Sequence, residues 1–288
     1  MLNVILDDTR DPARNLALDE ALVRAAALRV RTSRVPAPRV PAPRGPASPP
    51  HIPAPRTAVR RGEDPLDAAR GVAAHSAPPV LRVWQNSPSV VVGRFQNVAR
   101  AVDLVACARD GIDVVRRATG GGAICFDSGT LAFSLVQRPG HRVALDALVI
   151  SALEGLGMPG DALRDGRVVQ AATLRTRDAC LTHVAVQVRS ALRVAGSRTA
   201  HRCTASGVRP AAGTRPALAD LGAGMTVDAV RAAVLGAVMN EFGTARTRHP
   251  DAVERAVRDH LHAVRYGDLA WHLTGPRTAA ARQFSGRS

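Results

Sequence analysis

The chain contains no lysine: all 39 basic side chains among its 288 residues are arginine. Any mechanism that needs a lysine ammonium from this chain is therefore excluded. Aromatic residues make up only 3% of the sequence, so platforms on which the bases of single-stranded nucleic acid could stack are scarce. No run of about 18 apolar residues is present, which argues against a membrane-spanning helix.

Cysteine is also sparse, and its four positions form no CxxC pair. This spacing argues against a structural zinc site and favours free thiols, so we expect no metal held by cysteine. The first 15 residues carry acids where a secretory signal peptide needs bases, and we therefore expect a cytoplasmic protein.

The chain is rich in apolar residues and carries an excess of positive charge. Hydrophobic residues make up 46% of the sequence, enough to build the core of one large domain. The formal net charge of +15 favours anionic partners such as nucleotides or acidic protein surfaces. Because the arginines are spread along the chain without a recognition motif, we do not expect nucleic-acid binding. We expect a monomer.

One stretch near the N-terminus has a different composition. Residues 36–55 hold nine prolines interleaved with arginine, and no acid occurs between residues 21 and 62. Repeated PAPR units suit neither a helix nor a strand, so we expect an extended insertion at about 31–62. A basic, proline-rich tract could also dock onto an aromatic groove or a polyanion, and that alternative stays open.

Hydrophobic periodicity and turn residues predict the regular elements. Helices are expected over 11–30, 101–110, 143–156, 226–242 and 251–264. Strands are expected over 80–84, 89–93, 112–116, 131–136, 182–188 and 191–195. Since helices and strands are mixed without regular βαβ alternation, the sequence predicts an α+β domain over residues 1–275 and a flexible tail over 276–288.

The most informative segment, residues 116–131, reads RRATGGGAICFDSGTL. Three consecutive glycines let backbone N–H groups converge on one point, which makes an anion-binding nest. Two preceding arginines supply guanidinium groups suited to phosphate or carboxylate. A glycine-rich hairpin with solvent-facing arginines is the alternative, but the flanking arginines and the DxGxL that follows favour an anion site.

This segment resembles the RRxxGGGAVxHDxGxL motif of the lipoate–protein ligase family, which includes lipoyl and octanoyl transferases and is related to biotin–protein ligases. Three other segments match that family in order: DPARNLALDEAL at 11–22, LRVWQNSPSVVVGRFQN at 81–97, and RYGDLAW at 265–271 with Thr274-Gly275. The resemblance implies a catalytic domain of mixed, largely antiparallel sheets flanked by helices.

The resemblance also implies an activity. Such enzymes activate lipoate or octanoate with ATP and Mg²⁺ as the acyl-adenylate, and then transfer the acyl group to a lysine of a lipoyl carrier domain or a glycine-cleavage H-type protein. Arg94 is then expected near the activated carboxyl, and Trp84 in the acyl tunnel or in the core. The residues expected at the nucleotide or adenylate are Arg117, Gly120, Gly121, Gly122, Ala123, Ile124 and Cys125.

The sequence departs from the family at several positions. Phe126 stands where the family has the histidine of its HD pair, and Arg193 replaces the family's lysine in a strand that reads RVAGSR. An arginine fork is not equivalent to a compact ammonium at a close-contact site. The family's asparagine-aspartate and histidine-glycine pairs, before and after this strand, are not recognisable.

Cys180 suggests a second mechanism, because some acyltransferases of this family place a nucleophilic cysteine before the lysine strand. A thiolate there could accept octanoyl as a thioester, although the sequence favours a small buried side chain at this position. The candidate catalytic residues are therefore Arg193 and Cys180. Three functions stay open: a ligase, a cysteine-dependent octanoyltransferase, and a non-catalytic protein that binds an acyl-adenylate or a carrier domain. The acyl group, lipoyl, octanoyl or biotinyl, is also open.

Overall fold

The computed structural model describes residues 1–33, 78–141, 143–189, 217–222 and 224–276. Met1–Ala27 and Pro78–Ser288 form one compact unit, and Leu28–Ala77 form a second. The predicted insertion, the 191–195 strand and the C-terminal tail lie wholly or mostly outside the described residues. Within the described residues, no helix combines the length and apolar character needed to cross a bilayer.

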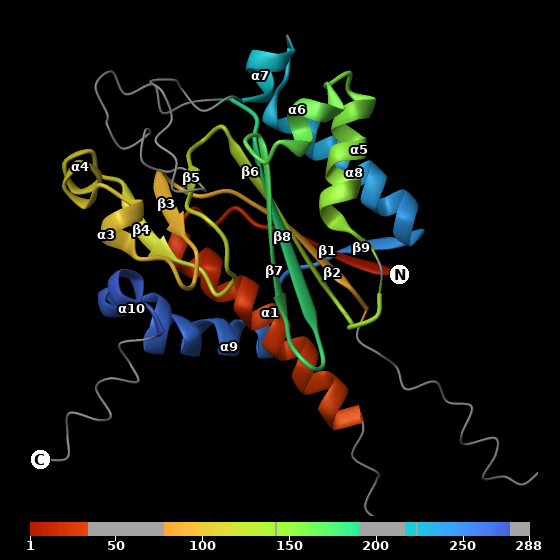
Figure 1. The fold of residues 1–288 in the computed structure, drawn as a ribbon. Helices are drawn as coiled ribbons and strands as arrows, with labels where there is room; N and C mark the ends of the chain where they lie inside the picture. Colours follow the sequence, from red (N-terminus) through yellow and green to blue (C-terminus); the bar gives the residue numbers. More distant parts are fainter. Residues whose placement is uncertain (34–77, 142, 190–216, 223, 277–288) are drawn as a thin grey trace, which may run out of the picture. The chain divides into compact units, whose positions relative to one another are not determined.

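Two mixed sheets form the framework of the first unit (Figure 1). Sheet A has six strands in the order β7 (Val169–Arg175), β8 (Cys180–Gln187), β6 (Thr130–Gln137), β2 (Val80–Trp84), β1 (Leu2–Leu6) and β9 (Ala245–Thr247). Sheet B has three strands in the order β4 (Asp113–Arg116), β3 (Ser89–Val92) and β5 (Ile124–Phe126). Strand β1 pairs in parallel with its two neighbours, whereas β6, β7 and β8 pair in antiparallel fashion.

Helices surround both sheets. They are α1 (Pro12–Ser33), α3 (Val98–Ala101), α4 (Leu104–Arg109), α5 (Leu145–Gly155), α6 (Gly160–Arg164), α7 (Leu218–Leu221), α8 (Val227–Phe242), α9 (Ala252–Leu261), the π-helical turn η2 (His262–Tyr266) and α10 (Leu269–Thr274). The predicted α+β class with mixed sheets flanked by helices is confirmed.

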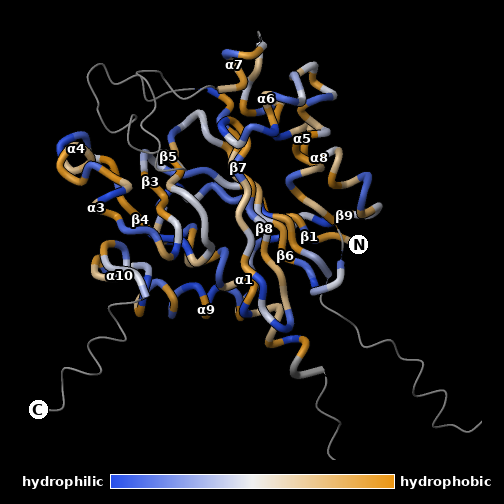
Figure 2. The backbone as a smooth tube through the Cα atoms, in the orientation of Figure 1, coloured by the Kyte–Doolittle hydropathy of each residue, from blue (hydrophilic) through white to orange (hydrophobic). Residues whose placement is uncertain are grey.

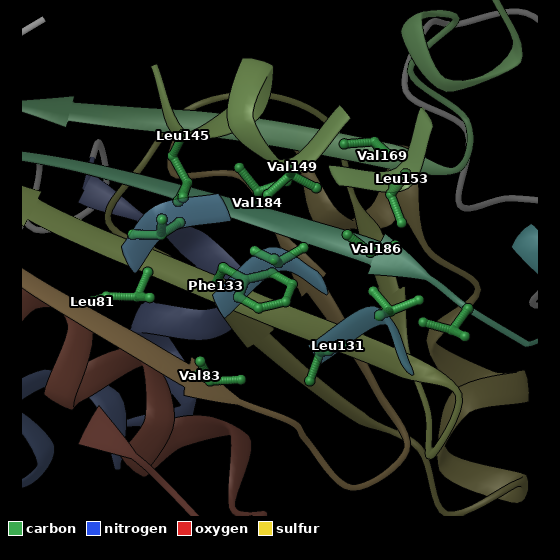
Figure 3. Close-up of a cluster of buried hydrophobic side chains, with 14 of the residues drawn as sticks. Leu81, Val83, Leu131, Phe133, Leu145, Val149, Leu153, Val169, Val184 and Val186 are labelled. Atoms are coloured by element: carbon green, nitrogen blue, oxygen red, sulfur yellow. The ribbon is translucent and has the colours of Figure 1, made fainter. Parts of the chain in front are cut away.

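Alternation along the strands of sheet A separates two cores. Leu131, Phe133 and Leu135 of β6 point toward α5 and α8, where they join an entirely apolar cluster (Figure 3). The intervening Ala132 and Val136 point toward α1 and belong to a second cluster. The central strands are accordingly apolar along most of their length (Figure 2).

Several sequence predictions differ from the structure. The helix expected over 101–110 is two short helices, α3 and α4, each with a side-chain cap at its first turn, from Asn97 and Asp103. Strands β1, β5, β7 and β9 were not predicted, nor was α10 as a helix. Strand β7 escapes pattern reading because alternate residues along it are exposed and weakly apolar.

Candidate functional site

The glycine loop, residues 117–123, connects β4 to β5 and packs directly on the GRFQN turn that follows β3. A Cβ at Gly93 would lie 2.0 Å from the carbonyl oxygen of Gly121, so a side chain there is excluded unless the loop shifts. Gly121 has φ of +95°, which favours glycine. The amide of Arg94 donates to the Thr119 carbonyl at 2.8 Å. Two motifs far apart in sequence thus form one surface.

The loop presents backbone donors. Among the described residues, no acceptor is assigned to the amide N–H groups of Gly120, Gly121 or Gly122. Gly121 is exposed, and the other two are half-buried. Unpaired, accessible amides in a glycine turn can bind an anion, as the sequence predicts for these residues.

Arg117 supports this loop from inside the protein. Its Nη2 donates to the carbonyls of Gly120 at 2.6 Å and Gly122 at 2.8 Å, its Nη1 to the Val91 carbonyl, and its Nε to Thr119 Oγ1. Four of the five guanidinium N–H groups are therefore used within the protein. Burial lowers its pKa to about 10, so the group stays charged at neutral pH. Arg117 thus holds the loop through its backbone carbonyls, and its expected contact with a ligand phosphate stays a prediction.

Arg116 is also buried, and backbone carbonyls accept from its guanidinium. Its Nη1 donates to the carbonyls of Gly93, Arg94 and Gln96, and its Nε to those of Trp271 and His272. Burial lowers its pKa. Arg116 therefore joins the GRFQN turn to the C-terminal helix α10, two of the segments on which the family resemblance rests.

Arg94 also has an unused donor at this surface. Its Nε is buried without a hydrogen-bond partner among the described residues, and its guanidinium lies 5.5 Å from the ring centre of Phe95. Phe95 itself is 70% exposed. A buried, unpartnered N–H is costly unless an acceptor arrives, which fits the expectation that Arg94 meets a ligand carboxyl or phosphate.

An apolar cavity lies beneath the loop. Its walls are Leu16, Trp84, Val91, Arg117, Ile124, Phe126, Ala132, His183, Val184 and Ala185, so Arg117 and His183 are the charged or titratable side chains that line it. Trp84 and Phe126 stack with ring centres 5.4 Å apart. The free space of about 10 Å³ holds roughly one water molecule, so a longer acyl chain requires these side chains to move.

The side chains of strand β5 point alternately into the cavity and into a separate apolar cluster. Ile124 and Phe126 line the cavity, whereas Cys125 packs with Cys107 in a separate apolar cluster around α4. Burial, together with the neighbouring Cys125, raises the pKa of Cys107 to about 11. These thiols are placed as packing groups, and Ala123 and Ile124 are buried.

Buried polar residues that the sequence did not single out lie behind the cavity. Asp19 of α1 pairs with Arg82 at 2.7 Å, accepts from Ser134 at 2.8 Å and lies 3.4 Å from His183 Nδ1. Burial alone would raise the pKa of Asp19, but Arg82, His183 and Ser134 hold it below its usual value. Asn15 and Asp19, four residues apart on the buried side of α1, were the sequence signal for this cluster.

Cys180, one of the two candidate catalytic residues, is not brought to this site. Cys180 begins β8 and pairs with Gln137 at the far end of the sheet register from Thr130. By strand alternation it points to the face opposite His183, and this placement argues against a thioester role at the glycine loop. Arg193 lies outside the described residues. No group of three or more metal-ligating side chains gathers within the described ranges.

The fold matches those of solved structures from one family. Lipoate–protein ligase A bound with ATP superposes with a TM-score of 0.65 and 20% identity, over 94% of this chain and 98% of that one. A bipartite lipoate–protein ligase, studied with its E2 lipoyl domain from Thermoplasma acidophilum, gives a TM-score of 0.64 and 20% identity, over 96% and 97% of the two chains. At this identity the likeness establishes the fold.

Sequence comparison adds the family. Human mitochondrial lipoyl amidotransferase LIPT1 is 38% identical over 80 residues, which are 27% of this chain and 21% of that protein. The match thus spans about a fifth of the relative's length. The family model of the lipoyl protein ligase A/B catalytic domain matches residues 67–237, more than half of the chain. The chain therefore belongs to the lipoyl protein ligase A/B catalytic domain family.

Proposed function

We propose that the protein activates lipoate or octanoate with ATP as the acyl-adenylate and transfers the acyl group to a lysine of a lipoyl carrier domain. The observation that carries this proposal is the glycine loop, whose accessible amides lie above an apolar cavity. An acyl-adenylate has the matching two parts, because its apolar acyl chain is joined to a phosphate. The structural neighbours support the same assignment, since they include lipoate–protein ligases with bound lipoic acid, with bound ATP, and studied together with an E2 lipoyl domain.

The described residues fit the two ends of such a ligand. The N–H groups of Gly120 to Gly122 would bind the α-phosphate, and the free Nε of Arg94 would donate to a phosphate or carboxyl oxygen. The acyl chain would enter between Trp84 and Phe126. We assign no residue to Mg²⁺, which would be held largely by the ATP phosphates, as this ion prefers.

Adenylation requires the acid's carboxylate to attack the α-phosphorus while pyrophosphate leaves. Negative charge shifts toward the phosphoryl oxygens, where preorganised amides and guanidinium groups stabilise it. The carrier lysine then attacks the acyl carbonyl, forms the amide and displaces AMP. The charge that the family obtains from lysine would come here from Arg193.

The decisive experiment is mass spectrometry of an apo lipoyl domain after incubation with the protein, ATP, Mg²⁺ and either acid. We expect a gain of one acyl group. Arg94→Gln should lower the rate by about 10²-fold, the usual cost of losing one such donor. Arg100→Gln, at an exposed position of the neighbouring helix α3, is the matched control and should leave the rate unchanged. No acyl gain with either acid would contradict the proposal.

Arg193 is tested in the same assay. Arg193→Ala should abolish turnover, whereas Arg193→Lys should retain or raise it, because lysine is the family's usual residue. Cys180→Ser should leave transfer intact; loss of transfer with an acyl-thioester trapped on the wild type would instead establish the cysteine-dependent mechanism.

A second function, binding without catalysis, is favoured by the departures from the family motif at Phe126 and Arg193. Phe126 fills space beside Trp84 where the family has a smaller, polar imidazole. If the protein only binds, a non-hydrolysable acyl-adenylate mimic will raise its melting temperature while the lipoyl domain gains no mass. This pair of results would replace the enzyme by a non-catalytic family member.

A further inference from the structure

A continuous chain of buried hydrogen bonds runs from helix α1 to the glycine loop. Asp19 Oδ2 lies 3.4 Å from His183 Nδ1, His183 Nε2 lies 2.8 Å from Thr119 Oγ1, and Arg117 Nε donates to the same oxygen at 3.0 Å. Each of the four residues is at least nine-tenths buried. The chain joins two elements that are more than 90 residues apart in sequence.

The chemistry of the end groups fixes where the protons lie. A guanidinium has no acceptor, so Thr119 Oγ1 accepts from Arg117 and has one hydrogen left for His183 Nε2. Asp19 pairs with the buried Arg82 at 2.7 Å and is ionised, so it accepts from Nδ1. With Nδ1 of His183 as the donor to Asp19, Nε2 is the acceptor for the Thr119 hydroxyl.

Three charged groups lie around His183. The charged groups near it are Asp19 from α1, Arg82 from β2, which reaches it through Asp19, and Arg117 from the loop, which reaches it through Thr119. Its neighbours in sheet A, Ser134 of β6 and Ala172 of β7, are uncharged.

We propose that His183 is a positioning residue for the glycine loop. By accepting the Thr119 proton it fixes the direction of that hydroxyl, which orients the Arg117 guanidinium, and Arg117 in turn holds the Gly120 and Gly122 carbonyls. In a trans peptide the N–H points opposite to the preceding carbonyl, so the inward Gly120 carbonyl turns the amide of Gly121 outward. This inference rests on the proposed function, since it assigns the loop amides to a ligand phosphate, and His183 itself touches no reacting atom.

Two substitutions of similar size separate this role from simple packing. Glutamine can place its amide oxygen near the position of Nε2 and accept from Thr119, whereas asparagine reaches only the position of Nδ1, beside Asp19. We expect His183→Asn to lower kcat for octanoate-dependent pyrophosphate release by at least about tenfold, with KM for octanoate little changed. His183→Gln should recover most of that loss. Thr182→Val, on the same strand but the opposite face, is the matched control.

A second measurement reads the hydrogen-bond chain without any activity. Nitrogen NMR of the ¹⁵N-histidine-labelled full chain should show a His183 ring protonated on Nδ1 alone, and Thr119→Val should shift the Nε2 resonance. A ring protonated on Nε2, or equal rates for the asparagine and glutamine variants with unchanged melting temperatures, would overturn the inference. If the wild type transfers no acyl group, the proposed function fails, and the NMR result still decides whether this hydrogen-bond chain exists.

Discussion

The two faces of sheet A differ in composition although they share the same strands. On the face toward α5 and α8, β6 presents Leu131, Phe133 and Leu135 to apolar partners. On the face toward α1, β6 presents the polar Ser134 between apolar neighbours. Arg82 and His183, from the two adjacent strands, are buried on the same face. The first face is a core that needs little beyond shape and volume, whereas the second holds charges that must be paired.

The difference shows how one sheet combines a stable core with support for the proposed binding loop. Apolar burial contributes roughly in proportion to area and tolerates a change of shape. Buried charges contribute little net stability, but removing one partner is expensive because the other charge is left uncompensated. The polar face therefore fixes the arrangement of the loop above it, at the cost of sensitivity to single changes.

The largest effect is expected for Asp19→Ala. Arg82 would lose the carboxylate at 2.7 Å, and Ser134 and His183 would lose their acceptor. The free energy of unfolding should fall by about 3–5 kcal/mol, measured by urea denaturation. Asp228→Ala, which breaks the exposed pair with Arg231, should cost less than about 1 kcal/mol. If both substitutions lowered the free energy of unfolding equally, the buried ion pairs of the polar face would be no more important than a surface pair.

Leu153→Ala tests the apolar face. Leu153 of α5 is fully buried against the strands, and its truncation should cost about 2–5 kcal/mol. The increase in melting temperature caused by an acyl-adenylate mimic should remain, because the loop is on the other side of the sheet. Loss of that increase in Leu153→Ala would show that the two faces do not act separately.

Gly93→Ala tests the contact between the GRFQN turn and the glycine loop. The new methyl group would overlap the Gly121 carbonyl, so the loop must shift, at a cost of about 1–3 kcal/mol. We expect the stabilisation by the mimic to disappear. Gly155→Ala is the control, since a Cβ there meets no atom within 4 Å. If the Gly93→Ala protein bound the mimic normally, the contact between the GRFQN turn and the glycine loop would not be needed for binding.

The smallest expected effect is the pH dependence of stability that arises from buried carboxylates. Asp7, Asp19 and Glu20 have pKa values held below their usual range by arginine and hydrogen-bond partners, against the effect of burial. Their contribution to stability is present above about pH 4 and is lost as the pH falls through the folded-state values, by up to about 1.4 kcal/mol per pH unit for each group. Asp19→Asn should reduce this slope in urea unfolding below pH 4; an unchanged slope would contradict the assignment.

The sequence predicted the elements that follow a simple period. The helix near 226–242 was visible from Val230, Val234 and Val238, and all three are fully buried in α8. Strand β2 was predicted with its observed bounds. Strand β7 and the short helix α10 were missed because an exposed strand and a six-residue helix carry too few periodic positions.

Within the site, the sequence indicated the glycine loop and Arg94 but not the direction of the two adjacent arginines. A sequence shows that Arg116 and Arg117 are charged; the structure shows that backbone carbonyls, rather than a ligand, take up most of their donors. His183 gave no signal, because its role depends on Asp19 and Thr119, which are distant in sequence. Pairing between remote segments is the information that local patterns do not contain.

The bonds of Arg116 have a consequence for the order of assembly during synthesis. Its guanidinium donates hydrogen bonds to the carbonyls of Trp271 and His272, which lie 155 and 156 positions later in the chain. Until the ribosome has released that C-terminal segment, the buried cation lacks these acceptors and the turn at Gly93 lacks its final support. Contacts of such long range close late, so the sheets can pair before the loop above them acquires its final form. A nascent chain stopped before residue 269 would carry the binding motif without the segment that completes it.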